Sequence, residues 1–116
     1  MGIENNARIK TEKDRLRKIF KNLPTERKKT VEKLVERAAF MLISLENMEN
    51  EINSDGLITE MVQGKYTIER AHPLLSTYNT MIKNYAAVTK QLCDNLPDSE
   101  QEKAGQDIMN FVAKPK

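Results

Sequence analysis

A single apolar repeat dominates this chain between Thr25 and Asn53. Its apolar residues recur at alternating steps of three and four, so that one stripe of an α-helix faces a neighbouring helix. The repeat consists of Val31, Leu34, Ala38, Met41, Leu45, Met48 and Ile52, and no Gly or Pro interrupts it. At ~1.5 Å per residue this helix is about 40 Å long, more than the width of a compact domain of this size. The stripe must therefore pack against another helix or another chain.

A second stripe follows Pro73 and predicts the partner helix. Pro73 suits the first turn of a helix, and Leu96-Pro97 closes the run. The apolar residues between them repeat at nearly the same 3.5 spacing. The two helices are expected to run antiparallel, and their shared seam would serve a core or an oligomer interface. The predicted seam residues are Leu34, Met41, Leu45, Met48, Tyr78, Met81, Tyr85 and Leu92.

Between the two stripes the pattern changes to that of strands. Residues 57–62 and 65–70 are two six-residue runs containing Thr, Val, Ile and Tyr, and Gln63-Gly64 would form the turn. The pattern predicts a β-hairpin at 57–70 in which Met61 faces Tyr66; an irregular loop is the alternative. A two-stranded hairpin alone is marginal in water. It must lie on the helices or pair its edges with a neighbouring subunit.

Shorter elements flank this core. A helix is expected from Lys10 to about Asn22, with Thr11 as its N-cap, and Thr25 would cap the long helix. A final helix is expected from about Ser99 to Phe111 or Val112. The predicted fold class is mainly α: two long antiparallel helices joined by a β-hairpin, with short N- and C-terminal helices. A single helical domain at 10–112 would follow a flexible arm at 1–9 and precede a tail at 113–116.

The sequence predicts no enzyme, no cofactor and no metal site. Its four glycines are scattered, so no phosphate-binding loop is present. One Cys and one His cannot supply the four ligands of a structural zinc site. Cys93 is expected to be a small buried or half-buried hydrophobe, and His72 to have a capping or surface role. No apolar run approaches the ~20 residues of a membrane span, and the single Cys and the polar N-terminus fit a cytoplasmic protein.

The net charge of +2 hides an asymmetry. Residues 1–37 carry twelve Lys and Arg against six Asp and Glu, whereas residues 38–116 carry seven against eleven. Such a basic end can contact a polyanion, although cations that only solvate helix faces remain the alternative. The candidate DNA-binding residues are Arg15, Arg17, Lys18, Lys21, Arg27, Lys28, Lys29, Lys33 and Arg37. Residues 10–22 and 25–38 could form the two helices of a helix-turn-helix. Two features argue against this motif: the turn contains Pro where Gly is more usual, and the second helix is too long for a compact recognition helix.

Several segments resemble the small terminase subunits of tailed phages and prophages of Gram-positive bacteria. The likeness runs from about Lys18 to Pro97. It is carried by residues 29–41, the turn Gln63-Gly64-Lys65, residues 66–74, residues 78–85 and residues 92–97. Two positions depart from the family: His72-Pro73 replaces an Asn-Pro, and the chain after Leu96 lacks the usual arginines. The second departure leaves the N-terminal cations as the better DNA candidates.

The resemblance implies a non-enzymatic, ring-forming adaptor in the cytoplasm of the bacterial host. It would bind phage DNA and present it to a large terminase subunit that carries the ATPase and nuclease. Two other functions remain open. One is a helical module that binds another phage or prophage protein without touching DNA. The other is a small dimeric DNA-binding regulator, which would read two symmetric half-sites.

Overall fold

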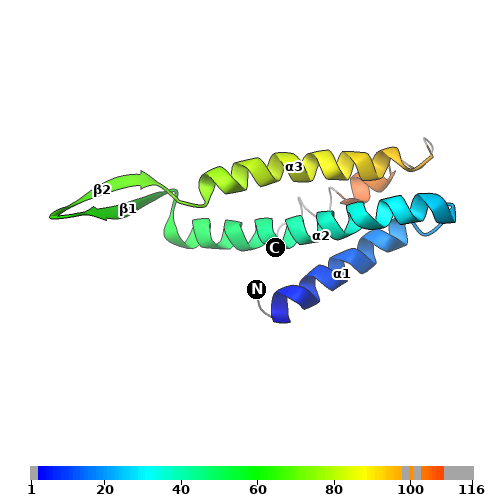
Figure 1. Cartoon of the computed structure of the whole chain (residues 1–116), viewed down its shortest axis with the longest axis horizontal. Helices are drawn as coiled ribbons and strands as arrows, with labels where there is room; N and C mark the ends of the chain where they lie inside the picture. Colours follow the sequence, from blue (N-terminus) through cyan, green and yellow to red (C-terminus); the bar gives the residue numbers. More distant parts are fainter. Residues whose placement is uncertain (1–2, 98–99, 101–102, 109–116) are drawn as a thin grey trace.

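The computed structural model describes residues 3–97, 100 and 103–108. Its elements are α1 (Ile3–Ile19), α2 (Thr25–Asp55), β1 (Ile58–Gln63), β2 (Tyr66–Ala71) and α3 (Leu75–Asp94). The molecule is elongated, measuring 63 × 29 × 25 Å, and the hairpin forms one of its ends (Figure 1). The expectation of a mainly helical chain with an antiparallel hairpin between long helices is confirmed.

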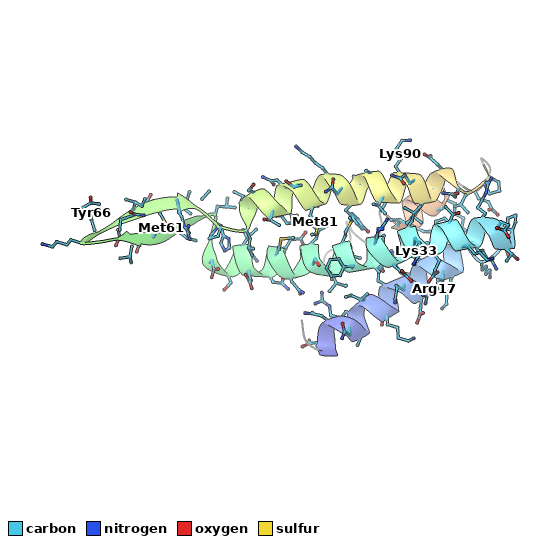
Figure 2. The ribbon with its side chains drawn as sticks, in the orientation of Figure 1. Arg17, Lys33, Met61, Tyr66, Met81 and Lys90 are labelled. Atoms are coloured by element: carbon cyan, nitrogen blue, oxygen red, sulfur yellow. The ribbon has the colours of Figure 1, made fainter. Side chains whose placement is uncertain are left out.

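Helix α2 is the central element, and both α1 and α3 pack against it (Figure 1). Its apolar repeat explains this, because the stripe is wide enough to bury residues against two neighbours. The predicted seam residues all lie in the core or against it. Leu45, Met48, Tyr85 and Leu92 are buried, whereas Leu34, Met41, Tyr78 and Met81 are half-buried against the same cluster. Figure 2 shows Met81 between α3 and α2.

Polar contacts show which ends of α2 and α3 meet. Near the end of α2, the Tyr78 hydroxyl donates to Glu49 Oε2 at 2.8 Å. Near the start of α2, Arg27 Nη1 lies 3.5 Å from the carbonyl oxygen of Asn95. The end of α2 therefore lies beside the start of α3, and the start of α2 lies beside the end of α3.

Two predicted helix starts are wrong. Residues 3–9 are the first turns of α1 rather than a flexible arm, and Thr11 is an interior residue whose Oγ1 donates to the carbonyl oxygen of Ala7 at 3.0 Å. The extension is held by Arg8, which contacts α2 through Glu46 at 2.6 Å. Helix α2 begins one residue earlier than expected, at Thr25, because Pro24 rather than Thr25 occupies the cap position and the Pro24 carbonyl accepts from Lys28 N at 2.9 Å.

The C-terminal predictions fall partly outside the described residues. Residues 103–108 are helical, in agreement with part of the helix expected at 99–112, and Ala104 and Ile108 are buried in the core. Residues 98–99, 101–102 and 109–112 lie outside the described part of the chain, as do the expected tail at 113–116 and residues 1–2 at the start.

The hairpin has the predicted type but a shifted register. Met61 pairs with Ile68, and Tyr66 pairs with Gln63 rather than Met61. Each strand therefore starts one residue later than expected, and Gly64 and Lys65 form the turn. The physical reason is the backbone at Gly64, which has φ +59° at the first central position, as in a type II′ turn. The predicted turn would have required positive φ at Gln63, which is unfavourable for a residue with a side chain.

Three contacts of His72 fix the root of the hairpin to the helices. The buried His72 ring brings Nε2 within 2.9 Å of Asp55 Oδ2, and its Nδ1 accepts from the Leu74 backbone N–H at 3.0 Å. The backbone N–H of His72 donates to the Leu57 carbonyl oxygen at 2.8 Å. His72 thus has the expected capping contact, but it is buried rather than at the surface. Gly56 (φ +86°) makes the turn that ends α2.

Candidate nucleic-acid interface

The nine candidate DNA-binding residues occupy the end of the molecule opposite the hairpin. They lie on the second half of α1, the connection to α2 and the first part of α2, where Figure 2 labels Arg17 and Lys33. Tyr66 marks the hairpin at the other end (Figure 2). The candidate cations therefore gather at one end of the rod, where the acidic residues Glu100 and Asp107 also line the surface beside Lys18 and Lys21.

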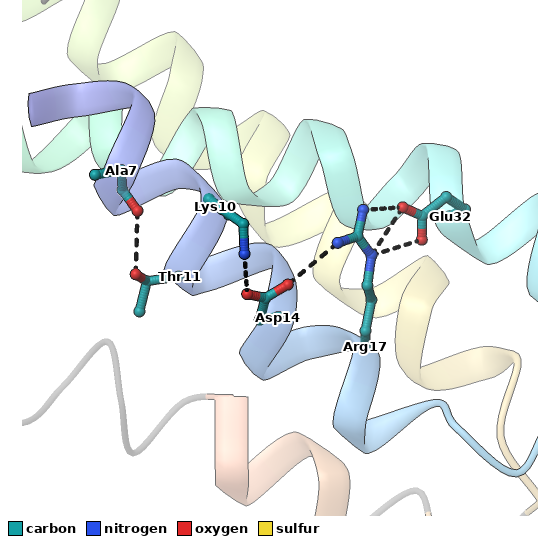
Figure 3. Close-up of polar contacts among 6 residues, drawn as sticks. All are labelled: Ala7, Lys10, Thr11, Asp14, Arg17 and Glu32. Atoms are coloured by element: carbon teal, nitrogen blue, oxygen red, sulfur yellow. Dashed lines mark hydrogen bonds and ion pairs between the residues drawn. The ribbon is translucent and has the colours of Figure 1, made fainter. Parts of the chain in front are cut away.

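Arg17 is committed to an ion pair within the protein. Its guanidinium bridges α1 and α2: Nε lies 2.9 Å and 3.1 Å from the two carboxylate oxygens of Glu32, and Nη2 also contacts Glu32 (Figure 3). Nη1 reaches Asp14 at 3.2 Å. The hydrogen bond with Glu32 raises the pKa of Arg17, and the Lys10 ammonium lowers the pKa of Asp14. Arg17 stabilises the packing of α1 on α2 and is a poor candidate for contacting phosphate.

Arg15 is committed in a similar way. Its Nε and Nη2 form a bidentate pair with the carboxylate of Glu12, at 2.7 and 2.8 Å. Glu12 is only 2% exposed, and a buried carboxylate requires such a partner. Arg15 Nη1 also lies 3.4 Å from the Asp107 carbonyl oxygen. Replacing Arg15 would therefore destabilise the fold, so its effect on DNA binding could not be separated from an effect on stability.

Two further cations have weak contacts. Lys29 Nζ lies 3.9 Å from Glu26 Oε1, and both side chains are exposed, so this pair contributes little. The Arg27 contact with the Asn95 carbonyl oxygen, at 3.5 Å, is long. Both residues keep most of their charge available to a ligand.

The remaining candidates form no ion pair with any described residue, and all are exposed. They are Lys18, Lys21, Lys28, Lys33 and Arg37. Lys29, Lys33 and Arg37 follow one another at steps of four along α2, which places them on one face of the helix. We name these three residues the α2 basic row.

Lys21 and Lys28 lie apart from this row, at a groove between α1 and α2. The groove has a volume of about 270 Å³ and is lined by Phe20, Val31 and Val35, with the Arg17–Glu32 pair beside them. Because Arg17 and Glu32 neutralise each other, the two lysines give this apolar groove a positive rim. We name it the α1–α2 groove.

Sequence reasoning missed a polar network where α1 crosses the middle of α2. Arg8 Nη1 donates to Asn47 Oδ1 at 2.8 Å, and Asn47 donates to Asn5 Oδ1 at 3.3 Å. The Tyr85 hydroxyl of α3 is buried and has no hydrogen-bond partner among the described residues. Burial, followed by the nearby Glu12 charge, raises the pKa of Tyr85. In this region the sequence offered one local indication of an ion pair, which is the i,i+3 spacing of Glu12 and Arg15.

The hairpin carries most of the exposed large hydrophobic side chains among the described residues. Of six exposed large hydrophobic side chains among the described residues, five are in or beside the hairpin: Leu57, Ile58, Val62, Tyr66 and Ile68. The sixth is Phe40 on α2. Exposed apolar patches of this kind are common at sites where proteins bind other molecules. Sequence reasoning identified the free strand edges but not these side chains.

The described residues contain no cluster of His, Cys, Asp and Glu that could hold a metal ion. Burial, with a contribution from Asp94, raises the pKa of the half-buried Cys93 thiol, so it stays protonated and weakly nucleophilic at neutral pH. No helix in the described ranges is long and apolar enough to cross a membrane. Comparisons with protein-family models, curated proteins and solved structures find no match.

Proposed function

We propose that this chain is a non-enzymatic DNA-packaging adaptor of the small terminase subunit type. It oligomerises, binds phage DNA through its basic end and presents that DNA to a large terminase ATPase and nuclease in the bacterial cytoplasm. The observation that carries the proposal is the set of exposed cations at one end of the rod that are unpaired or, like Lys29, only weakly paired, with the α2 basic row at its centre. Two long helices packed as an antiparallel pair would hold this end rigid.

Within this proposal, the ion pairs of the candidate residues favour some of them over others as phosphate contacts. Arg15 and Arg17 are engaged with Glu12, Asp14 and Glu32, so they stabilise the fold. Lys18, Lys33 and Arg37 are free of ion pairs with described residues and can reach phosphate oxygens. Contacts of this kind release counterions and depend steeply on salt, with little reading of base sequence.

Salt-dependent DNA binding tests the proposal directly. Fluorescence anisotropy with a 30-bp duplex of random sequence would give the affinity of the protein over a range of salt concentrations. The triple variant Lys29→Gln, Lys33→Gln, Arg37→Gln removes the α2 basic row. Each lost phosphate contact reduces the slope of log K against log salt by about 1, so the triple variant should lower it by about 3.

A matched control separates a local contact from an effect of net charge. The variant Lys65→Gln, Lys83→Gln, Lys90→Gln removes the same charge from the hairpin and α3. It should bind with a nearly unchanged slope. Equal losses in both triple variants, or no binding by the wild-type protein at low salt, would refute the DNA-binding role.

The exposed hairpin favours a second candidate function, a module that binds another phage protein without DNA. Its apolar side chains, such as Val62 and Tyr66, are typical of protein interfaces. The two functions differ in solution mass as well as in DNA binding. Light scattering should give a closed oligomer for the adaptor and a monomer for the simple module. The dimeric regulator is less favoured, because α2 runs unbroken over 31 residues and is too long for a compact recognition helix.

A further inference from the structure

One face of the hairpin combines apolar side chains with two unpaired carboxylates. Glu60 and Glu69 are directly opposite each other in the register, and both are exposed. Ile58 and Val62, two residues to either side of Glu60, share this face because side chains alternate along a strand. Neither carboxylate forms an ion pair with any described residue. We name this surface the hairpin acidic face.

The acidic face is unfavourable in an isolated molecule. Like charges directly opposite each other destabilise a strand pair, and Val62 is 77% exposed. A two-stranded hairpin is also marginal without further packing. A partner that supplied two cations around an apolar depression would remove both costs.

The same chain carries that complementary surface at its other end. The α1–α2 groove is apolar, and it is lined by Lys21 and Lys28, which form no ion pair with a described residue. In a molecule 63 Å long, with the hairpin at one end and the start of α2 at the other, the two surfaces cannot meet within one copy (Figure 1). They can meet between copies.

We propose that the hairpin acidic face of one copy docks in the α1–α2 groove of the next copy. Val62 enters the groove beside Phe20, and the carboxylates of Glu60 and Glu69 pair with the ammonium groups of Lys21 and Lys28. The contact is head-to-tail, so each copy uses both ends and the assembly continues until it closes into a ring. This inference rests on the oligomerisation in the proposed function and assigns the surfaces that produce it.

A symmetric pairing of two acidic faces is disfavoured by the same charges. Face-to-face contact would bring Glu60 and Glu69 of one copy against the same residues of the other, and like-charge contact across an interface is strongly unfavourable. The opposite face of the hairpin carries Met61, Tyr66 and Ile68 without an acidic residue. It is the competing surface for self-association.

The proposal has a consequence for DNA binding. Lys21 and Lys28 are covered in the assembly, and the α2 basic row stays open because it lies on another face of the helix. DNA contact in the oligomer therefore falls to Lys29, Lys33 and Arg37. Assembly and DNA binding can then be measured separately.

Charge exchange tests the contact without DNA. Sedimentation velocity over a concentration series at 100 mM salt would measure self-association of three variants. Glu60→Lys with Glu69→Lys, and separately Lys21→Glu with Lys28→Glu, should each weaken self-association by at least about 100-fold through like-charge contact. An equimolar mixture of the two double variants, or all four changes in one chain, should restore it to near the wild-type strength.

The rescue excludes a general effect of charge or misfolding. Both double variants should keep the wild-type circular dichroism spectrum, since an opposed Lys–Lys pair strains the hairpin no more than the Glu–Glu pair it replaces. The control Glu36→Lys with Glu51→Lys makes the same charge change at two exposed positions of α2 and should leave association unchanged.

Four outcomes would overturn the inference. It fails if the double variants associate normally, if the mixture is not rescued, or if Tyr66→Ala with Ile68→Ala abolishes assembly while the charge variants do not. A monomeric wild-type protein also overturns it. Loss of DNA binding with intact charge-exchange rescue would instead refute the DNA-binding role alone.

Discussion

The helical body and the hairpin treat apolar side chains in opposite ways. In the body, Leu16, Leu45 and Leu92 are buried to 2% exposure or less. In the hairpin, Ile58 and Val62 are more than half exposed. The body therefore buries these apolar side chains within one copy of the chain. The hairpin leaves its apolar side chains exposed, where a binding partner could cover them. The body thus holds the packed core of the described residues, and the hairpin is the region that the proposed self-association would cover.

The largest test of this comparison truncates one apolar residue in each region. Leu45→Ala removes a side chain that is fully packed between helices, so it should lower the free energy of unfolding by about 2–5 kcal/mol. Val62→Ala should change it by less than about 0.5 kcal/mol, because the side chain is exposed. Urea denaturation at low protein concentration, where the chain is least associated, measures both. If the two variants lost similar amounts of unfolding free energy, the Val62 side chain would have to be packed against the helices in solution.

A smaller difference is expected between carboxylates. Glu12→Gln leaves the Arg15 guanidinium without its bidentate partner in a buried site and should cost about 2 kcal/mol. Glu60→Gln should be neutral or stabilise by about 0.5 kcal/mol, because it relieves the repulsion from Glu69. The same urea titrations at pH 7 compare the two variants. A stabilising Glu12→Gln would contradict the role assigned to the buried pair.

Deletion of the hairpin tests whether the helical body folds without it. The backbone N–H of His72 already donates to the Leu57 carbonyl oxygen at 2.8 Å, so a Gly-Asn-Gly link can replace residues 58–71 without strain. The free energy of unfolding should change by about 1 kcal/mol or less, since loop length has a weak effect on stability. Self-association should be lost. Calorimetry and sedimentation on the same sample report the two results, and collapse of the melting transition would show that the body needs the hairpin.

The sequence predicted what depends on local pattern. The 3.5-residue repeat around Leu45 and Tyr85 located both long helices, and Gly64 located the turn. The register was off by one residue because Gly64 can occupy either central position, and only the first spares Gln63 a positive φ.

The misses depend on contacts between distant residues. The helical start of α1 is held by Arg8 and Glu46, which are 38 residues apart. In the candidate site, the Glu12–Arg15 spacing was visible locally, but the engagement of Arg17 by Glu32 required the packing of α1 on α2. For Arg17, a pairing of charges that are 15 residues apart therefore removed a predicted cation from the unpaired set.

The smallest expected effect compares two tyrosines and appears only at alkaline pH. Burial raises the pKa of Tyr85 above its ordinary value, and its hydroxyl has no hydrogen-bond partner among the described residues. Below pH ~10 both folded and unfolded states hold the proton, so Tyr85→Phe should change stability by only a few tenths of a kcal/mol. Above pH ~10 the unfolded state releases the proton while the folded state keeps it, so wild-type stability falls as pH rises.

Tyr85→Phe should therefore flatten the alkaline limb of a melting-temperature profile from pH 8 to pH 11. Tyr66→Phe is the matched control, because Tyr66 is 71% exposed on the hairpin, and its profile should follow that of the wild type. A Tyr85→Phe variant that loses several kcal/mol at pH 7 would show instead that the hydroxyl has a partner in the folded protein. The buried site in the body would then be a satisfied polar network, and the contrast with the exposed hairpin would rest on the apolar residues alone.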